Sequence, residues 1–528
     1  MKLTDLTLRE KVYRTVILNV KRMRGSGTIQ DLFDKYPIGG LYYAKGPAEG
    51  LIEAVPGDTS TRADFVEKCK CASKYPLLVC ADGATIENGP KPAYSCLLGA
   101  TNSEKHAYDY GKSLGMQMNY NKVDWILGPC VDLPLFRCTE TISGTMSDDP
   151  VYASKMYAQV VKGIQSQKVA ATVKHFPGIG THHVNMHISA GQNVLDFDKW
   201  METYGYVYKE MFKAGVMSVM TSHITLRSFS EKADYGTIPI ATHSKDLTIG
   251  LLKEKLGFEG VVVTDALTMG GCTVGSQVEE AVAAFACGAD ILLWPPVEAG
   301  DRIVEEIEAG RIPMSRLDDA IERIQRLYDK LGITLEEKDR ERMPADPDFV
   351  EKTFKEINEK GITLIRDELG NLPLNKNRSK VLIDLIASES KKNDADEKIE
   401  GAEIIADMLK KEGFSVDIKW NYVNFIDKSL NEELKPYDYV IIMLDAPISI
   451  GATRDCFNSA WTVHLIPDEK KVFLNFASPY FIDDYYPEEK TFVHIGAPIS
   501  PDRARAAANA ILGKSKMTGK LMQTNIKV

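Results

Sequence analysis

Up to about residue 335, the chain alternates short apolar runs with amphipathic segments. The runs are rich in β-branched and aliphatic residues at successive positions, which is typical of parallel strands covered by helices on both faces. They lie at 39–44, 76–81, 123–129, 169–176, 214–223, 260–267 and 289–295. The segments between them have helical patterns. In one of these, Ser244 is placed to cap the helix start and Gly257 to end it.

This repetition of β-α units favours a (β/α)8 barrel over a doubly wound sheet. An amphipathic helix at 315–332 closes the series. The polar stretch 336–350 is predicted to be an exposed linker. A second alternation follows, and its length is that of an ordinary domain. We therefore predict an α/β protein in which residues 1–335 form a (β/α)8 TIM-type barrel and residues 351–528 form an α/β sandwich domain.

Composition narrows the function classes. With 528 residues, 44% hydrophobic and 26% charged, the chain has the profile of a soluble globular enzyme or binding protein of more than one domain. The formal net charge of -10, without a basic tract, argues against nucleic acid as a partner. No apolar run is long enough to span a membrane, so no membrane association is expected. A charged N-terminus and nine scattered cysteines indicate reduced thiols and a cytoplasmic location.

The chemistry of a (β/α)8 barrel lies just after its strands. The polar residues at or beyond the predicted strand ends are Asp82, Asp132, Lys174, His175, His223 and Asp265. Asp265 directly follows the apolar run VVVT, where a carboxylate either faces the barrel mouth or caps the next helix.

The segment KHFPGIGTHHVNMH, residues 174–187, raises a separate question, because it holds four of the nine histidines. Zinc binding by His182, His183 and His187 is one interpretation. The neighbouring glycines and proline argue against a helix there, and no nearby cysteine or carboxylate completes a ligand set. We predict neither a metal nor a cofactor.

Six segments in order resemble glycoside hydrolase family 3, and more specifically its bacterial β-N-acetylglucosaminidase branch. They are LTLREKV, KHFPG, GVVVTDALTM, RLDDAIERIQRLYDKLG, ITLIRDELGNLPL and ILGKSKMTGKL. The resemblance covers nearly the whole chain. It implies a barrel followed by an α/β sandwich, in agreement with the architecture inferred from the pattern of apolar runs.

The resemblance also implies roles for individual residues. Retaining β-glycosidases need a carboxylate nucleophile and a proton donor, and the family's nucleophile position corresponds to Asp265. Alignment with a family pattern like KHFPGHGDTxxDSH places His187 at the acid/base histidine and Asn185 at the residue that orients it. Histidine suits this role because its ordinary pKa is near neutrality. The expected substrate-binding residues are Asp82, Lys174, His175, His223 and Asp132. For His223 a core histidine, and for Asp132 a loop-orienting carboxylate, are the alternatives.

The sequence departs from the family pattern around this site. Asn185 replaces an aspartate, Ile179 a histidine and Thr181 an aspartate, and Thr145 lies near an expected arginine. The sugar-binding loop reads ADGATIENG where the family has a sequence like DQEGGRV. An asparagine oxygen still accepts the imidazole N–H, but it stabilises an imidazolium less than a carboxylate does.

These features predict a retaining, exo-acting β-N-acetylhexosaminidase that cleaves terminal β-linked sugars through a covalent glycosyl-Asp265 intermediate, with a small carbohydrate as its partner. One alternative is a β-glucosidase-like enzyme, but 445–461 lacks the glutamate that the second domain would then supply. The others are a phosphorylase of the same family and a sugar-binding relative with impaired catalysis, which Asn185 would explain. The oligomeric state leaves no mark in the sequence.

Overall fold

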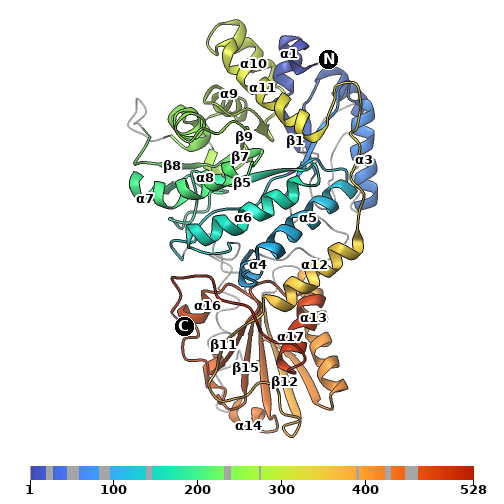
Figure 1. Ribbon diagram of the computed structural model, residues 1–528, viewed down its shortest axis with the longest axis vertical. Coiled ribbons are helices and arrows are strands. Elements are labelled where there is room, and N and C mark those ends of the chain that lie inside the picture. Colours follow the sequence, from blue (N-terminus) through green and yellow to red (C-terminus); the bar gives the residue numbers. More distant parts are fainter. Residues whose placement is uncertain are drawn as a thin grey trace. The chain divides into compact units, whose positions relative to one another are not determined.

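The chain forms two compact units in the computed structural model, which describes residues 2–19, 28–43, 59–82, 95–137, 145–230, 239–272, 275–387, 392–422, 430–445 and 462–527 (Figure 1). Unit one comprises Met1–Gly89, Ala107–Leu133 and Tyr157–Pro347, and unit two comprises Pro90–His106, Pro134–Met156 and Asp348–Val528.

The division differs from the predicted domain bounds in two places, since residues 336–347 of the predicted linker belong to unit one. Residues 90–106 and 134–156, expected in the barrel domain, belong to unit two because they contact its C-terminal segment. The Lys520 amide donates to the Ala100 carbonyl at 2.9 Å, and the Thr524 amide and hydroxyl donate to the Asp148 carboxylate at 2.6 and 2.7 Å. Sequence patterns do not show such contacts between distant segments.

Unit one is built on an eight-stranded parallel sheet of order β10-β1-β2-β3-β4-β5-β7-β9. A parallel bridge between Val263 and Ile291 links its two edges, so the sheet is a nearly closed barrel and the predicted fold is confirmed. The strands are β1 (Val16–Asn19), β2 (Gly40–Tyr42), β3 (Leu78–Ala81), β4 (Trp125–Ile126), β5 (Ala170–Phe176), β7 (Ser218–Thr221), β9 (Val261–Thr264) and β10 (Leu292–Leu293). Strand β1 was not predicted, because it follows helix α1 (Leu8–Tyr13) without an intervening turn signal.

Helices surround this barrel (Figure 1). They are α2 (Ile29–Lys35), α3 (Thr59–Ala72), α5 (Glu104–Tyr120), α6 (Pro150–Gln165), α7 (Phe197–Glu202), α8 (Tyr204–Lys213), a π-helix (Asp246–Lys255), α9 (Gln277–Ala286), α10 (Ala299–Glu308) and α11 (Met314–Leu331). The Ser244 hydroxyl accepts the Leu247 amide at 3.2 Å, and Gly257 has a φ of 72°, as expected for the ends of that helix. Short strands β6 (Gly191–Asn193) and β8 (Ile224–Leu226) form a separate parallel pair.

The polar stretch 336–350 is not exposed throughout, which corrects the prediction of a solvated linker. The Arg340 side chain is 1% exposed, and its Nε donates to Asp124 Oδ1 at 3.0 Å. Its Nη2 donates to Asn119 Oδ1 at 2.9 Å. Charged residues dominate this stretch, which is why the sequence predicted a linker, but Arg340 and Arg342 both contact the buried Asp124 carboxylate of unit one.

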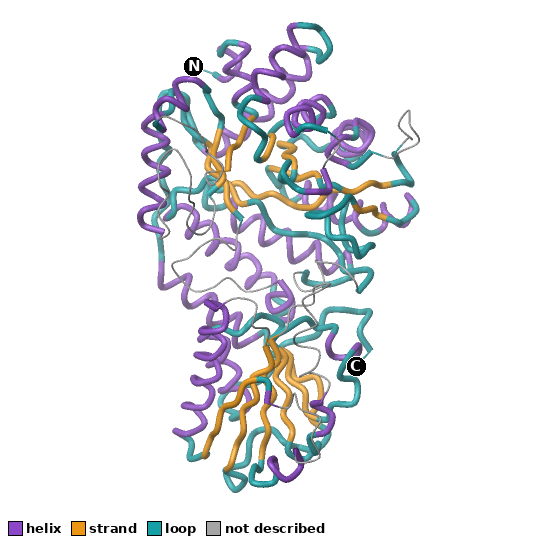
Figure 2. The backbone as a smooth tube through the Cα atoms, turned by 180° about the vertical axis from the view of Figure 1, so that it is seen from behind, coloured by secondary structure: helices purple, strands orange, loops and turns teal. Residues whose placement is uncertain are grey.

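Unit two contains a six-stranded sheet of order β11-β16-β15-β14-β12-β13, in which only the β11–β16 pair is antiparallel. Figure 2 shows these strands side by side in one sheet. The strands are β11 (Thr363–Asp367), β12 (Lys380–Ala387), β13 (Ser415–Trp420), β14 (Tyr439–Asp445), β15 (Lys471–Asn475) and β16 (Thr491–His494). The helices are α4 (Ser95–Ala100), α12 (Pro347–Lys360), α13 (Lys392–Lys411), α14 (Leu430–Leu434), α16 (Phe481–Asp484) and α17 (Pro501–Ile511).

Separate apolar clusters form on the two faces of this sheet. Ile383 and Ile441 belong to one of them, together with residues of α13 and α17, and Leu382 and Ile442 belong to the other. The predicted α/β sandwich is confirmed. Within the described parts of both units, no helix is long and apolar enough to cross a membrane.

Candidate active site

Polar side chains meet where strands β3, β5 and β9 end. Asp82 follows β3, Lys174 and His175 lie near the end of β5, and Asp265 follows β9. Lys174 Nζ lies 2.9 Å from Asp82 Oδ1, and His175 Nε2 lies 3.9 Å from Asp265 Oδ2. The structure thus brings together four of the residues that the sequence predicted for the site.

Asp82 and Lys174 form a charged pair that Tyr42 completes. The Tyr42 hydroxyl donates to Asp82 Oδ2 at 2.6 Å. Burial acts to raise the pKa of Asp82, but the Lys174 ammonium and the Tyr42 hydroxyl outweigh it, and the pKa lies below its ordinary value. Burial likewise opposes the charge on Lys174, yet Asp82 and Asp265 hold the pKa of Lys174 above its ordinary value. Both groups are therefore charged at neutral pH.

Tyr42 was missed in the sequence, although it ends strand β2 and so satisfies the same strand-end rule as the predicted residues. Its ring also packs edge-on against that of Trp294, with 4.8 Å between the centroids. Trp294 directly follows the last barrel strand. An aromatic wall therefore lies beside the Asp82–Lys174 pair.

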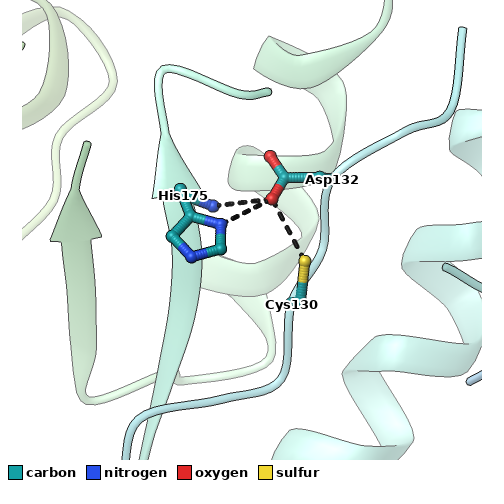
Figure 3. A group of neighbouring side chains, drawn as sticks. All are labelled: Cys130, Asp132 and His175. Atoms are coloured by element: carbon teal, nitrogen blue, oxygen red, sulfur yellow. Dashed lines mark hydrogen bonds and ion pairs between the residues drawn. The ribbon is translucent and has the colours of Figure 1, made fainter. Parts of the chain in front are cut away.

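Asp132 is a hydrogen-bond centre beside His175 (Figure 3). Its Oδ2 accepts from the His175 backbone amide at 3.1 Å, bonds the ring Nδ1 at 2.8 Å and accepts from Cys130 Sγ at 3.1 Å. Its Oδ1 accepts the Ile179 amide at 2.8 Å. The Asp132 side chain is 0% exposed, and its contacts orient His175 and the loop that follows, as in the alternative considered above. The substrate contact of Asp132 stays a prediction.

Cys130, Asp132 and His175 are also a group of three potential metal ligands, with their ligand atoms within 4.8 Å of one another. Metal coordination by cysteine uses the thiolate. Burial, reinforced by the Asp132 charge, raises the pKa of the Cys130 thiol above its ordinary value, so the thiol keeps its proton and donates it. We interpret the group as a hydrogen-bonded cluster. In the described part of the chain, the ligand atoms of His182, His183 and His187 form no such group.

Asp265 differs from the other carboxylates in having one oxygen without a partner. Its Oδ1 accepts the Ala266 amide at 2.7 Å, and this amide belongs to the next residue rather than to a helix start. Its Oδ2 is buried and has no hydrogen-bond partner among the described residues. An unpartnered buried carboxylate oxygen is costly, and such groups are enriched where a ligand completes the site.

Asn185 and His187 form the side-chain pair that the family pattern suggested. Asn185 Oδ1 lies 3.0 Å from the His187 ring Nδ1 and accepts the His187 amide at 2.9 Å. The Asn185 carbonyl accepts the amides of Ile188 and Ser189 at 3.0 and 3.1 Å, which closes a turn. Both side chains of the pair thus lie on a tight turn, and His187 is exposed.

His223 is fully buried, and both of its ring nitrogens bond protein groups. Nε2 lies 3.1 Å from the Ala266 carbonyl, which only accepts, and Nδ1 lies 2.9 Å from the Thr242 hydroxyl. Burial lowers the pKa of His223, against the opposing effect of the Asp265 charge, so the ring is neutral. His223 thus has the geometry of the core histidine considered above and holds the backbone just after Asp265, while its substrate contact stays a prediction.

The structure describes only some of the other positions at which the sequence departs from the family pattern. Residues 83–94 and 446–461, which contain the rest of the sugar-loop sequence and the region without a glutamate, lie outside the described residues. Ile179 is buried in an apolar cluster with Met186, Ile224, Ala266 and Met269. The Thr181 hydroxyl accepts the Val194 amide at 3.2 Å. At both of these positions the replacement of a polar family residue is accommodated by local packing.

Comparison with known proteins adds to this geometry. The model of the glycosyl hydrolase family 3 N-terminal domain matches residues 7–327. A beta-N-acetylglucosaminidase/beta-glucosidase of Cellulomonas fimi is 28% identical over 498 residues, which cover 87% of this chain and 86% of that protein. Beta-hexosaminidase A of Pseudoalteromonas piscicida is 24% identical over 332 residues, which cover 57% of this chain and 55% of that protein.

Two solved structures have the same fold. The beta-glucoside phosphorylase BglX bound to 2FGlc matches with a TM-score of 0.82 and 23% identity, over 99% of this chain and 95% of its own. A glycoside hydrolase family 3 beta-N-acetylglucosaminidase from Paenibacillus sp. str. FPU-7 matches with a TM-score of 0.80 and 24% identity, over 98% and 99%. The family model spans more than half of the chain and includes every candidate site residue, and the protein therefore belongs to glycosyl hydrolase family 3.

Proposed function

We propose that the protein is a retaining, exo-acting β-N-acetylhexosaminidase with Asp265 as nucleophile and His187 as acid/base. The observation that carries this proposal is Asp265 Oδ2, which is buried at a strand end, has no hydrogen-bond partner among the described residues and lies 3.9 Å from His175 Nε2. A carboxylate with one oxygen held by a backbone amide and the other left without a hydrogen bond is suited to attack an anomeric carbon.

Asp265 would attack the anomeric carbon through Oδ2 while the leaving oxygen takes a proton from His187. Asn185 Oδ1 is an acceptor, so the His187 Nδ1–H points to it and Nε2 is the nitrogen that exchanges the proton. In the second step His187 takes a proton from water, and the water oxygen displaces Asp265 from the sugar. At the end of the cycle His187 is protonated again and Asp265 is no longer bonded to the sugar.

The charged pair of Lys174 and Asp82 would hold the sugar. Lys174 and Asp82 offer a donor and an acceptor to adjacent hydroxyls, and charged partners make the stronger hydrogen bonds. Two such contacts near the barrel mouth suit a terminal sugar with its hydroxyls exposed. The preference for an N-acetylated sugar is supported by the KHFPG and histidine segments and by the description of the Cellulomonas fimi relative, which also names beta-glucosidase.

A phosphorylase is the second candidate, because Asn185 replaces a carboxylate beside His187. A neutral amide repels an anionic acceptor less than a carboxylate would. Lys174 adds a positive charge near Asp265. Both features lower the electrostatic repulsion that phosphate would meet at the glycosyl-Asp265 intermediate. Water is neutral and meets no such repulsion.

The proposal is tested with activated aryl β-glycosides of N-acetylglucosamine and glucose, compared by kcat/KM, and with a 5-fluoroglycosyl fluoride as a trap. We expect the N-acetylglucosaminide to be the better substrate and peptide mapping to find the trapped sugar on Asp265. A preference for glucose would change the sugar but keep the mechanism. An adduct on another residue, or no turnover of any β-glycoside, would refute the proposal.

A further inference from the structure

The turn that carries His187 rests on the loop that follows Asp265. The Gly270 amide donates to the His187 carbonyl at 2.8 Å, and the Gly271 amide donates to the Met186 carbonyl at 3.1 Å. Gly270 and Gly271 begin a short 3-10 helix five residues after Asp265. Through these two backbone bonds, the candidate acid/base is attached to the same loop as the candidate nucleophile.

Both contact positions require glycine. A Cβ on Gly270 would lie 2.3 Å from the Ile188 carbonyl oxygen and 2.9 Å from its carbon. A Cβ on Gly271 would lie 2.5 Å from the Met186 carbonyl oxygen. These atoms belong to the backbone and have no rotamer with which to avoid the clash, so any side chain would displace the turn.

A buried side chain supports the turn from the same side. Met186 is 3% exposed and packs in the apolar cluster that includes Ala266 and Met269, both from the loop after Asp265. Ile188, two residues later, is 77% exposed, and His187 between them is also exposed. The turn therefore has an anchored inner side and an outer side that presents His187.

We propose that Gly270 and Gly271 are positioning residues, a glycine seat that fixes the place of the His187 imidazole relative to the Asp265 carboxylate. The inference rests on the proposed function and extends it to residues that touch neither substrate nor the reacting atoms. Proton transfer depends steeply on geometry, and a displacement of about 1 Å costs on the order of 100-fold in rate. The backbone contacts of Gly270 and Gly271 hold the turn, and with it His187, in one position.

The test compares Gly270→Ala and Gly271→Ala with Gly275→Ala as a matched control, since a Cβ on Gly275 meets no atom within 4 Å. For each variant kcat/KM is measured over a series of leaving groups, because it reports the first chemical step. We expect the two seat variants to lose about 100-fold on alkyl leaving groups and little on dinitrophenyl, which departs without a proton. The control should match the wild type throughout.

A double-mutant cycle separates positioning from general damage. His187→Ala removes the group that the seat holds, so Gly270→Ala should add almost nothing to it on poor leaving groups. Trapping of the fluorosugar on Asp265 by Gly270→Ala would show that the nucleophile is intact. If the glycine variants fold poorly, Met186→Ala loosens the anchor without a clash and should give the same dependence on leaving group.

The outcomes distinguish the seat from the function it rests on. The glycine seat is refuted if the loss of kcat/KM in His187→Ala depends on the leaving group but the seat variants lose equally on all substrates. It is also refuted if the effects of Gly270→Ala and His187→Ala add. In both cases the acid/base role of His187 stands. If His187→Ala shows no dependence on the leaving group, the proposed role of His187 falls, and the seat falls with it.

Discussion

At the scale of residues, the three carboxylates of the site differ in how many partners they have. Asp132 accepts four donors on its two oxygens, and Asp82 accepts from Lys174 and Tyr42. Asp265 accepts only the Ala266 amide among the described residues and keeps Oδ2 unpartnered. Because a carboxylate with all lone pairs engaged is a poor nucleophile, partner number separates a positioning aspartate from a reacting one.

The first prediction concerns Asp265. Asp265→Asn keeps the shape and the Ala266 bond but removes the nucleophile, so kcat/KM should fall by roughly 10⁴-fold. The free energy of unfolding should change little, because the Ala266 bond is kept and Oδ2 has no hydrogen bond to lose among the described residues. Steady-state kinetics and urea unfolding check both parts. Asp198→Asn, exposed on α7, is the control and should change neither. Turnover by Asp265→Asn at the wild-type rate would contradict the assignment.

The second prediction concerns Lys174. Lys174→Met keeps the length of the side chain but loses the ammonium that faces Asp82, so kcat/KM should fall by about 10- to 100-fold, the worth of one charge-assisted hydrogen bond. Lys213→Met is the matched control, because Lys213 is 73% exposed and its ammonium bonds Glu210 on the same helix. An unchanged kcat/KM in Lys174→Met would remove this residue from the sugar site.

Much of this site was predictable residue by residue, and there is a physical reason why the rest was not. Asp82, Lys174, His175 and Asp265 follow from one rule, that polar groups at barrel strand ends carry chemistry. The partners of those residues do not follow from it. Which oxygen of Asp132 meets Cys130, or that both nitrogens of His223 are used internally, depends on distances between segments that the sequence pattern does not contain.

At the scale of elements, strand β5 shows why two consecutive residues both serve the site. Successive side chains of a regular strand point to opposite faces. The pairing of β5 with β7 shifts register between Val173 and Phe176, and Lys174 and His175 lie within this irregularity. Irregular pairing of this kind re-aims side chains and is common next to active sites. The helices and most strands were predicted from periodicity, but a local shift of register leaves no such pattern.

The third prediction concerns the segment at 336–350 that was taken for an exposed linker. Arg340→Met should destabilise unit one by about 3 kcal/mol, because Asp124 loses a buried partner. The loss is at the lower end for a broken buried pair, since Arg342 still contacts Asp124 at 2.8 Å. Urea unfolding followed by tryptophan fluorescence is suitable, because Trp125 is buried beside Asp124. Arg326→Met, on the exposed side of α11, is the control. Equal, small losses in both variants would show that the segment is not docked by Arg340.

The fourth prediction concerns strand β16. His494 is buried, with Nδ1 3.1 Å from the Asn475 amide nitrogen, and burial lowers its pKa to about 3. The unfolded state has the ordinary pKa near 6.5, so it binds more protons than the native state between these values. The contribution of the neutral His494 ring to the free energy of unfolding is therefore fully present above about pH 6.5, and it is lost as the pH falls toward 3.

Removing this histidine should weaken the acid sensitivity of unfolding. When the pH falls from 7 to 5, the free energy of unfolding of His494→Gln should decrease less than that of the wild type. The difference should be up to about 1.4 kcal/mol per pH unit. Urea titrations at several pH values measure the difference. His464→Gln is the control, since His464 is an exposed histidine of the same unit and should keep the wild-type slope. Identical slopes in all three proteins would contradict the prediction.

At the scale of the whole molecule, the fold does not decide which nucleophile ends the reaction. Structures described as a phosphorylase and as a beta-N-acetylglucosaminidase match this chain with TM-scores of 0.82 and 0.80. The succession of a barrel and a sandwich was predictable from two alternations of apolar runs, whereas residues 90–106 and 134–156 joined unit two through long-range contacts.

The last prediction therefore concerns the acceptor. In the proposed mechanism, the Lys174 ammonium interacts with the charge of Asp265, and the neutral Asn185 amide lies beside His187. One cation favours an anionic acceptor less than a cluster of cations would. Water needs only a general base, the role proposed for His187. We expect free sugar as the main product in phosphate buffer, with sugar 1-phosphate as the minor product. Product analysis by NMR with and without phosphate measures this partition, and a neutral buffer of equal ionic strength is the control. Sugar 1-phosphate as the dominant product, with slow turnover in the absence of phosphate, would make the protein a phosphorylase built on the same nucleophile.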